Sequence, residues 1–364
     1  MLPALPRLLV AAAVGFAPMT ALAQPIPDGP DRTLDAAERK AVIDGVLEKL
    51  TAHYVFPDVA KKMEEAVRAK QANKEYDGVS SGKEFAERLT ADLRAVCKDG
   101  HLRVRFSGTP LPPQPDRGPT EEERKRFLRF AESKNYGFQK VEHLPGKIGY
   151  LDLRGFMDAG LIGDAAAAAM TFLSTADAVV FDMRQNNGGD PAAVILLCSY
   201  LFDEPTHLND IYTRTDGTTR QFWSLPVVPG KKLVGKDVYV LTAKRTFSGA
   251  EEFAYNIKSQ KRGTIVGETT GGGAHPTRGF RVNDHFMVGV PFARSINPIT
   301  KTNWEGTGVA PDVPVPAGQA LLTAQKLALT KLIEKGGDPG QAAERKRALE
   351  QVEKELAKMT QTAK

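Results

Sequence analysis

From residue 147 to residue 268, short apolar segments alternate with stretches of helical periodicity. The apolar segments "KIGYLDL", "AVVFDM", "DVYVLT" and "GTIVGE" have the length and composition of buried strands. Between them lie "PAAVILLCSYLF" and "GAEEFAYNIKS", which fit helices. This alternation predicts parallel strands joined by crossover helices, so the expected fold class is α/β. The later segment "RGFRVNDHFMVGVPFA" predicts a β-hairpin appended to that core.

The segment that precedes the core predicts a separate helical unit. Residues 35–99 place apolar side chains at helical spacing in three successive stretches, which predicts three amphipathic helices. Ser81 and Glu84 have capping-box spacing at the start of the third helix, and Gly100 is expected to end it. "HLRVRF" then alternates as a strand does. The proline-rich "SGTPLPPQPDRGP" and the charged helix "TEEERKRFLRFAES" lead into the core.

The first 23 residues have the pattern of a secretory signal. One arginine precedes an apolar run, and "ALA" stands before Gln24, as at a cleavage site. The apolar run is short for a membrane span, so we expect an exported protein with no stable membrane insertion after cleavage, periplasmic or secreted. Two cysteines, Cys97 and Cys198, would then meet an oxidising environment. The sequence leaves a disulfide and two buried thiols equally open.

These patterns together divide the chain into five parts. The expected parts are a signal peptide (1–23), an N-terminal helical domain (24–106), a connector with its helix (107–146), an α/β catalytic core (147–330) and a charged helical tail (331–364).

Charge and histidine spacing exclude some classes of function. The chain has 49 basic and 44 acidic side chains, spread along its length, so it lacks the basic stripe of a nucleic-acid-binding protein. Four histidines show no metal-ligand spacing, and we expect no metal and no other cofactor: His53, His143, His207 and His285.

Two strand-to-helix turns carry residues suited to acyl chemistry. In "VVFDMRQNNGGD", glycines at the strand end allow backbone N–H groups to point into a site, although a plain tight turn explains them equally well. In "VYVLTAKRTFSGAEEF", Ser248 stands at a helix start, with Gly249 beside it. Ser248 and Glu251 also form a capping-box pattern, so this serine is either a helix cap or a nucleophile. A nucleophile needs a base from elsewhere in the chain.

Five motifs in order resemble the C-terminal-processing (tail-specific) serine peptidases. They are "GYLDLRGF", "VVFDMRQNNGGD", "VYVLTAKRTFSGAEEF", "GTIVGETTGGGAHP" and "GTGVAPDVPV". The chain is most similar to the branch that holds the interphotoreceptor retinoid-binding protein modules and the tricorn protease core, over about residues 35–330. The resemblance implies a crotonase/ClpP-like core, a peptide or protein substrate and no cofactor.

The resemblance also implies a set of site residues. Ser248 would be the nucleophile, and the N–H groups of Gly189 and Gly249 the oxyanion hole. Tail-specific members use a lysine 25 residues after the serine, where this chain has Gly273. The tricorn-like branch instead uses a histidine and a late glutamate, which here correspond to His101 in "CKDGHLRV" and Glu305 in "NWEGTGVAPD".

Some alternatives remain open at this point. His275, in "GGGAHP", is either a rival base or a histidine that lines the cleft. Only about 40 residues separate "HLRVRF" from the core, too few for the PDZ domain of the tail-specific enzymes, so we expect the 108–135 insert to cover the cleft instead. The expected function is an exported serine endopeptidase that acts through an acyl-enzyme. The alternatives are a catalytically weak or inactive binding protein for hydrophobic ligands and, less compatible with export, acyl-CoA chemistry.

Overall fold

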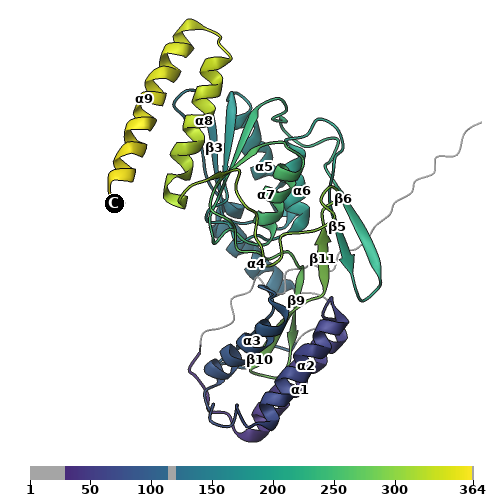
Figure 1. The fold of residues 1–364 in the computed structure, drawn as a ribbon. Helices are drawn as coiled ribbons and strands as arrows, with labels where there is room; N and C mark the ends of the chain where they lie inside the picture. The colour runs from purple at the N-terminus through teal and green to yellow at the C-terminus, as the bar shows by residue number, and fades with distance from the viewer. Residues whose placement is uncertain (1–28, 114–119, 363–364) are drawn as a thin grey trace, which may run out of the picture.

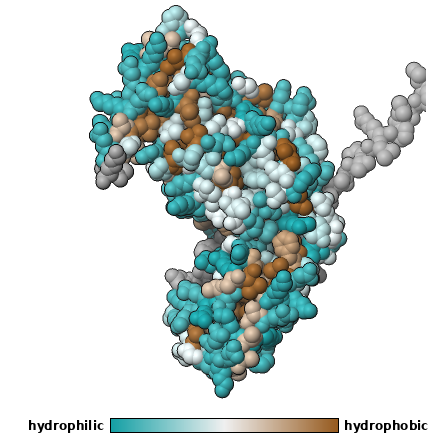
Figure 2. Space-filling view, in the orientation of Figure 1, coloured by the Kyte–Doolittle hydropathy of each residue, from teal (hydrophilic) through white to brown (hydrophobic). Residues whose placement is uncertain are grey.

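The chain folds into an N-terminal lobe and an α/β core, with a pair of C-terminal helices on the far side of the core (Figure 1). The structure is a computed structural model that describes residues 29–113 and 120–362. The expected signal peptide lies outside these residues. The space-filling view in Figure 2 shows that the molecule narrows where the two lobes meet.

The N-terminal lobe contains the three predicted helices. They are α1 (Ala36–His53), α2 (Pro57–Ala72) and α3 (Gly82–Cys97). The Ser81 hydroxyl accepts a hydrogen bond from the backbone N–H of Glu84 at 3.0 Å, as the capping pattern predicted. The helix ends earlier than expected, because Lys98, with φ of 55°, takes the left-handed conformation that we assigned to Gly100.

The predicted hairpin forms, but it belongs to the N-terminal lobe. Its strands β9 (Thr277–Arg281) and β10 (Phe286–Pro291) pair antiparallel, and β10 also pairs with β1 (Arg103–Phe106). Alternate β10 side chains, among them Phe286 and Val288, are buried against the three helices. The expectation that the hairpin is appended to the core is therefore wrong: its apolar face completes the core of the helical lobe. The chain leaves the core after β8 and returns to it after β10.

A six-stranded mixed sheet forms the centre of the α/β core. Its strand order is β12-β8-β7-β4-β3-β2, and only the β2–β3 pair is antiparallel. The strands are β2 (Phe138–Leu144), β3 (Ile148–Leu153), β4 (Ala178–Asp182), β7 (Asp237–Thr242), β8 (Thr264–Gly267) and β12 (Val313–Pro314). The α/β expectation is confirmed.

Each face of this sheet is covered by helices. One set of strand side chains, such as Val179 and Phe181, packs against α5 (Ala159–Leu173), α6 (Pro191–Ser199) and α7 (Gly249–Ser259). The alternate set packs against α8 (Ala320–Glu334), on which α9 (Pro339–Thr362) lies. This alternation makes the central strands apolar on both sides, as their sequences indicated.

The remaining elements lie around the core. A three-stranded antiparallel sheet joins β5 (His207–Thr213) to β6 (Thr218–Trp223) and β11 (Ala293–Ile296). The connector helix α4 (Glu121–Ser133) packs on the 3-10 turn η2 (Asn135–Gly137), and a second such turn, η3 (Ala317–Gln319), precedes α8. None of the helices described here has the length and apolar character that a membrane span requires. Both cysteines are free thiols.

Candidate active site

Ser248 lies at the carboxyl edge of the central sheet, in the turn between β7 and α7. It is the N-cap residue of α7, and its φ and ψ are 54° and −122°. A serine at positive φ is strained, and such outliers gather at functional sites, where the surrounding structure holds them in place. The turn therefore does more than begin a helix, since a cap residue normally has extended backbone angles.

The turn that contains Ser248 and Gly249 lies against a second glycine-containing turn. This neighbouring turn follows β4, which pairs with β7 in the sheet, and it contains Gly188 and Gly189. A Cβ at Gly188 would lie 2.6 Å from the nitrogen of Gly249, and one at Gly189 would lie 1.9 Å from the carbonyl oxygen of Phe156. Only glycine permits this approach. Within the described chain, the N–H groups of Gly189 and Gly249 donate no hydrogen bond, so both remain free to bind an anionic oxygen.

Glu251 anchors Ser248 to a glycine-rich loop that follows β8. This carboxylate is fully buried and accepts four hydrogen bonds. The donors are the N–H groups of Ser248 (2.8 Å), Gly272 (2.7 Å) and Gly273 (2.8 Å) and the hydroxyl of Thr270 (2.5 Å). Burial raises the pKa of Glu251, while these donors act to lower it. The predicted capping partner thus also fixes a second loop at the site.

His101 enters the same site from the N-terminal lobe, between α3 and β1. Its ring lies 4.7 Å, centroid to centroid, from that of Phe247, the residue before the serine. Its Nδ1 atom is buried and has no hydrogen-bond partner among the residues described. Burial lowers the pKa of His101 to about 4, so the imidazole is neutral at pH 7 and can accept a proton.

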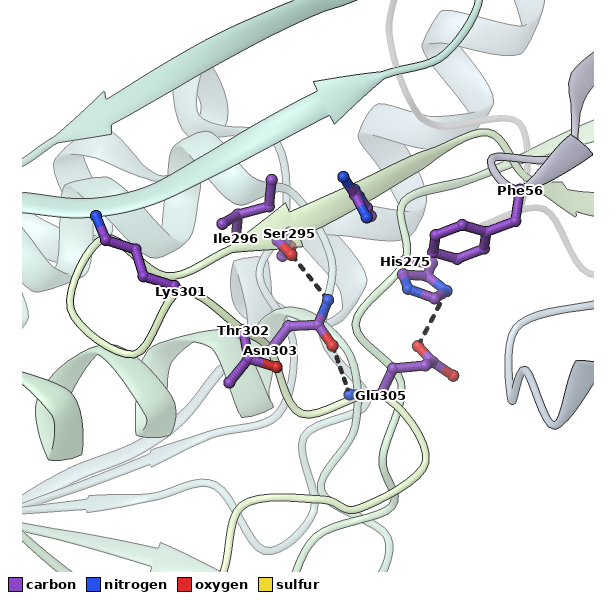
Figure 3. A pocket seen from close by; sticks show the side chains of 9 residues that line it. Phe56, His275, Ser295, Ile296, Lys301, Thr302, Asn303 and Glu305 are labelled. Carbon is purple, nitrogen blue, oxygen red and sulfur yellow. Dashed lines mark hydrogen bonds and ion pairs between the residues drawn. The ribbon is translucent and has the colours of Figure 1, made fainter.

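Glu305 and His275 meet at the lobe interface, next to Phe56 (Figure 3). The carboxylate of Glu305 accepts hydrogen bonds from the N–H groups of Gly100, at 3.2 Å, and Ala274, at 2.5 Å. Its Oε2 lies 3.4 Å from Nδ1 of His275. Burial raises the pKa of Glu305. Glu305 therefore links the glycine-rich loop to the backbone immediately before His101.

Asp99 is a buried carboxylate that the sequence analysis did not identify. Its Oδ2 lies 2.7 Å from Nδ1 of His275 and 3.3 Å from the hydroxyl of Tyr54, and its Oδ1 accepts the N–H of His101 at 3.0 Å. Burial alone would raise the pKa of Asp99, but the hydrogen bond and charge of His275 outweigh it, and the pKa is lowered. The acidic residue in "CKDGH", two positions before the histidine, was the available signal.

The structure thus brings together all six residues that the sequence singled out, but with different partners from those expected. No hydrogen bond joins Ser248 to His101, or His101 to Glu305, within residues 29–113 and 120–362. Instead, Glu305 is paired with His275. Side-chain atoms of Asp99, His101 and Glu305 lie within 4.8 Å of one another, a spacing that could hold a metal ion. Both carboxylates are already occupied by N–H donors, which fits a hydrogen-bonded network better than an open metal site.

The space that a longer side chain at residue 273 would need is occupied. A Cβ added to Gly273 would lie 2.2 Å from Cζ of Phe247 and 2.7 Å from Cε1 of His101. A side chain at this position would therefore have to displace one of the two rings.

A strained serine beside two free backbone N–H groups is the arrangement that acyl transfer requires. The chain belongs to peptidase family S41. The model of the family described as "Peptidase family S41" matches residues 147–315. A second one, "N-terminal domain of Peptidase_S41 in eukaryotic IRBP", matches residues 36–131.

One curated protein is similar in sequence, and solved structures are similar in fold. The chain is 29% identical over 178 residues to carboxyl-terminal-processing peptidase 2, chloroplastic, of Arabidopsis thaliana, and the match covers 47% of this chain and 32% of that protein. It is thus similar to about a third of that relative. The fold is similar to that of mature CPAF, with a TM-score of 0.53 and 13% identity over 82% of this chain and 99% of that one. A putative peptidase from Parabacteroides merdae gives a TM-score of 0.51 with 16% identity, over 76% and 90% of the two chains.

Proposed function

We propose that this protein is an exported serine endopeptidase that cleaves peptides or unfolded protein through an acyl-enzyme. Ser248 is the nucleophile and His101 is its general base. Glu305 positions His101, and the N–H groups of Gly189 and Gly249 form the oxyanion hole. His275 lines the cleft and holds Asp99 and Glu305 in place.

The occupied space at Gly273 is the observation that supports this proposal best. In lysine-dependent relatives the base would be on this residue, 25 positions after the serine. Here a side chain at residue 273 would collide with Cε1 of His101, so the imidazole fills the space next to the serine turn. The imidazole is neutral at pH 7 and can accept the serine proton, and its lowered pKa makes it a weaker base than an exposed histidine.

The proposed reaction has two stages. Ser248 Oγ attacks the substrate carbonyl carbon while His101 takes the hydroxyl proton, and the resulting oxyanion accepts hydrogen bonds from Gly189 and Gly249. His101 then gives this proton to the leaving amine as the C–N bond breaks, leaving an ester on Ser248. Water attacks the ester, with His101 again as base, and releases the carboxylic acid product.

The direct test is labelling with a fluorophosphonate probe, together with turnover of an unfolded protein substrate. Wild type should label and cleave, Ser248→Ala should do neither, and His101→Gln should lose about 10³-fold in both rates. Exposed Ser133 and His143 offer matched controls, because Ser133→Ala and His143→Gln should behave as wild type. Labelling that survives Ser248→Ala would refute the site. Labelling abolished by EDTA would favour a metal at Asp99, His101 and Glu305.

A specific observation favours the alternative of a weakly active or inactive binding protein for hydrophobic ligands. Residues 36–131 match the N-terminal domain found in eukaryotic IRBP, and Ser248 makes no hydrogen bond to His101. This reading predicts folded protein that binds a fluorescent fatty acid or retinoid but neither labels nor cleaves. Detectable labelling that depends on Ser248 decides for the peptidase.

Export is tested separately from the reaction. We propose that residues 1–23 are removed on export, which leaves Gln24 as the first residue. Edman sequencing of protein from the periplasm or medium should begin there. Full-length chain retained in the cytoplasm would contradict it.

A further inference from the structure

A pocket of about 320 Å³ opens beside the candidate active site, between β11 and the loop that leads to Glu305. In Figure 3, His275, Glu305 and Phe56 lie at one end of this pocket and Lys301 at the other. The volume is at the lower end of that of ligand-binding pockets and suits a single side chain of a larger substrate.

Arg294 also lines the pocket, and its guanidinium group stacks on aromatic rings instead of pairing with a carboxylate. Its guanidinium carbon lies 5.6 Å from the ring centre of Phe56 and 5.3 Å from that of Tyr212, which is its cross-strand neighbour. Its Nε atom is buried and lacks a hydrogen-bond acceptor among the residues described. Stacking on aromatic faces leaves the planar edge of a guanidinium free for two parallel hydrogen bonds to a carboxylate.

No acidic side chain of the described chain forms an ion pair with either cation of the pocket lining. Neither Arg294 nor Lys301 forms an ion pair in residues 29–113 and 120–362. Glu305, the acidic residue in the lining, is occupied by the backbone donors of Gly100 and Ala274 and by His275. Two unpaired cations therefore line a cavity whose wall also includes His275 and Glu305 of the candidate active site, and they favour an anionic occupant.

We infer that this pocket is a specificity subsite for an acidic side chain, aspartate or glutamate, close to the bond that is cleaved. The inference rests on the proposed peptidase function. Arg294 binds the carboxylate by paired hydrogen bonds, and Lys301, whose side chain is exposed, adds a second positive charge to the lining. The subsite gives selectivity among peptides and takes no part in the chemical step.

The test compares peptides that carry either Glu or Gln at one position, which differ in charge but little in size. Products from an amidated peptide library, read by mass spectrometry, should show Asp or Glu enriched at one position near the cleaved bond. Matched Glu and Gln peptides at that position should differ by about 10–100-fold in kcat/KM, as expected for a charge-assisted bidentate pair. Arg294→Gln should reduce this Glu/Gln ratio at least about tenfold, and Lys301→Gln, on an exposed side chain, about threefold.

Arg278 supplies a matched control, because it also lies over an aromatic ring, 5.7 Å from the centre of Phe280, but does not line the pocket. Arg278→Gln should leave the ratio unchanged. A ratio near one in wild type, an equal loss for both peptides in Arg294→Gln, or a strict need for a free peptide C-terminus would overturn the inference. If Arg294→Gln does not fold, an unchanged ratio in Lys301→Gln overturns it.

A binding measurement separates this inference from the proposed function. Fluorescence polarisation with the Ser248→Ala variant should show tighter binding of the Glu peptide than of the Gln peptide, and Arg294→Gln added to it should remove the difference. That result would support the subsite even if wild type failed to cleave. Cleavage without any Glu preference would leave the peptidase proposal standing and remove the subsite.

Discussion

The two halves of the candidate active site are built in different ways. The nucleophile half, around Ser248, sits on the ends of adjacent strands β4 and β7. The base half, around His101, sits on a short connection between a helix and a strand of the other lobe. One glutamate secures each half to the same glycine-rich loop: buried Glu251 binds it to Ser248, and half-buried Glu305 binds it to Gly100.

This difference separates stability from activity. Glu251 is enclosed in the α/β core, and all four of its hydrogen bonds are internal to that core. Glu305 joins the core to the N-terminal lobe, so breaking its contacts releases one lobe from the other. We therefore expect the first carboxylate to matter mainly for folding and the second mainly for alignment of His101 with Ser248.

The largest effect should follow from Glu251→Gln. The amide keeps only one acceptor oxygen, so at least one buried N–H loses its partner, at a cost of about 2–4 kcal/mol in the free energy of unfolding. Urea denaturation measures it. The matched control is the neighbouring Glu252→Gln, which should cost less than about 1 kcal/mol at pH 7, because burial raises the pKa of Glu252 to about 8 and it is already mostly neutral. Equal costs for the two variants would contradict the account.

Glu305→Gln should lower activity more than stability, the reverse of what we expect for Glu251→Gln. We expect kcat/KM for an unfolded protein substrate to fall by about 10²-fold, because the loop and Gly100 are no longer held together and His101 loses its alignment. The free energy of unfolding should change by less than about 1 kcal/mol, since the site is partly open to water. Glu204→Gln, at an exposed position in the loop between α6 and β5, is the control. A loss of stability without a loss of activity would break the distinction.

Gly273→Ala tests the packing between the halves. The added methyl group must displace Phe247 or His101, both of which it would approach to under 3 Å, and we expect about a tenfold loss in labelling rate. Gly163→Ala is the control, because its Cβ would meet no atom within 4 Å. A labelling rate for Gly273→Ala equal to that of wild type would show that the position of His101 is unimportant.

A further effect concerns pH and the stability of the nucleophile half. The pKa of Glu252 is raised from 4.5 to about 8 by burial, so the folded state holds a proton that the unfolded state releases between these values. Wild type should thus lose stability as pH rises from 5 to 8, and Glu252→Gln should lose about 3 kcal/mol less over that range. Urea midpoints at pH 5 and pH 8 measure the difference. If the urea midpoints of wild type and Glu252→Gln change equally between pH 5 and pH 8, Glu252 is not a buried, neutral carboxyl group.

The sequence predicted the nucleophile half better than the base half, for a physical reason. Ser248, Glu251 and Gly189 lie in local strand–turn–helix patterns, whose geometry depends on neighbouring residues. The pairing of Asp99 with His275 joins residues 176 positions apart, across the lobe interface, and no local pattern encodes it.

The prediction of where the hairpin packs was wrong for the same reason. An alternating hairpin shows that one face is buried, but not which lobe buries it, so Phe286 and Val288 were assigned to the wrong core. The tail was also only partly foreseen. The charged part expected at residues 331–364 forms α9, which nevertheless buries Ala348 and Val352 beside α8.

The central claim is that His101, from one lobe, acts as the base for Ser248, from the other. The most direct test is the pH dependence of the rate of inactivation by a fluorophosphonate, for wild type and His101→Gln. Because the pKa of His101 is lowered to about 4, the wild-type rate should stay level from pH 7 downwards and fall only as pH approaches 4, where the imidazole gains its proton. His101→Gln should react about 10³-fold more slowly and without that limb. A wild-type rate that falls with a midpoint near 6.5, or a His101→Gln rate equal to that of wild type, would contradict the claim.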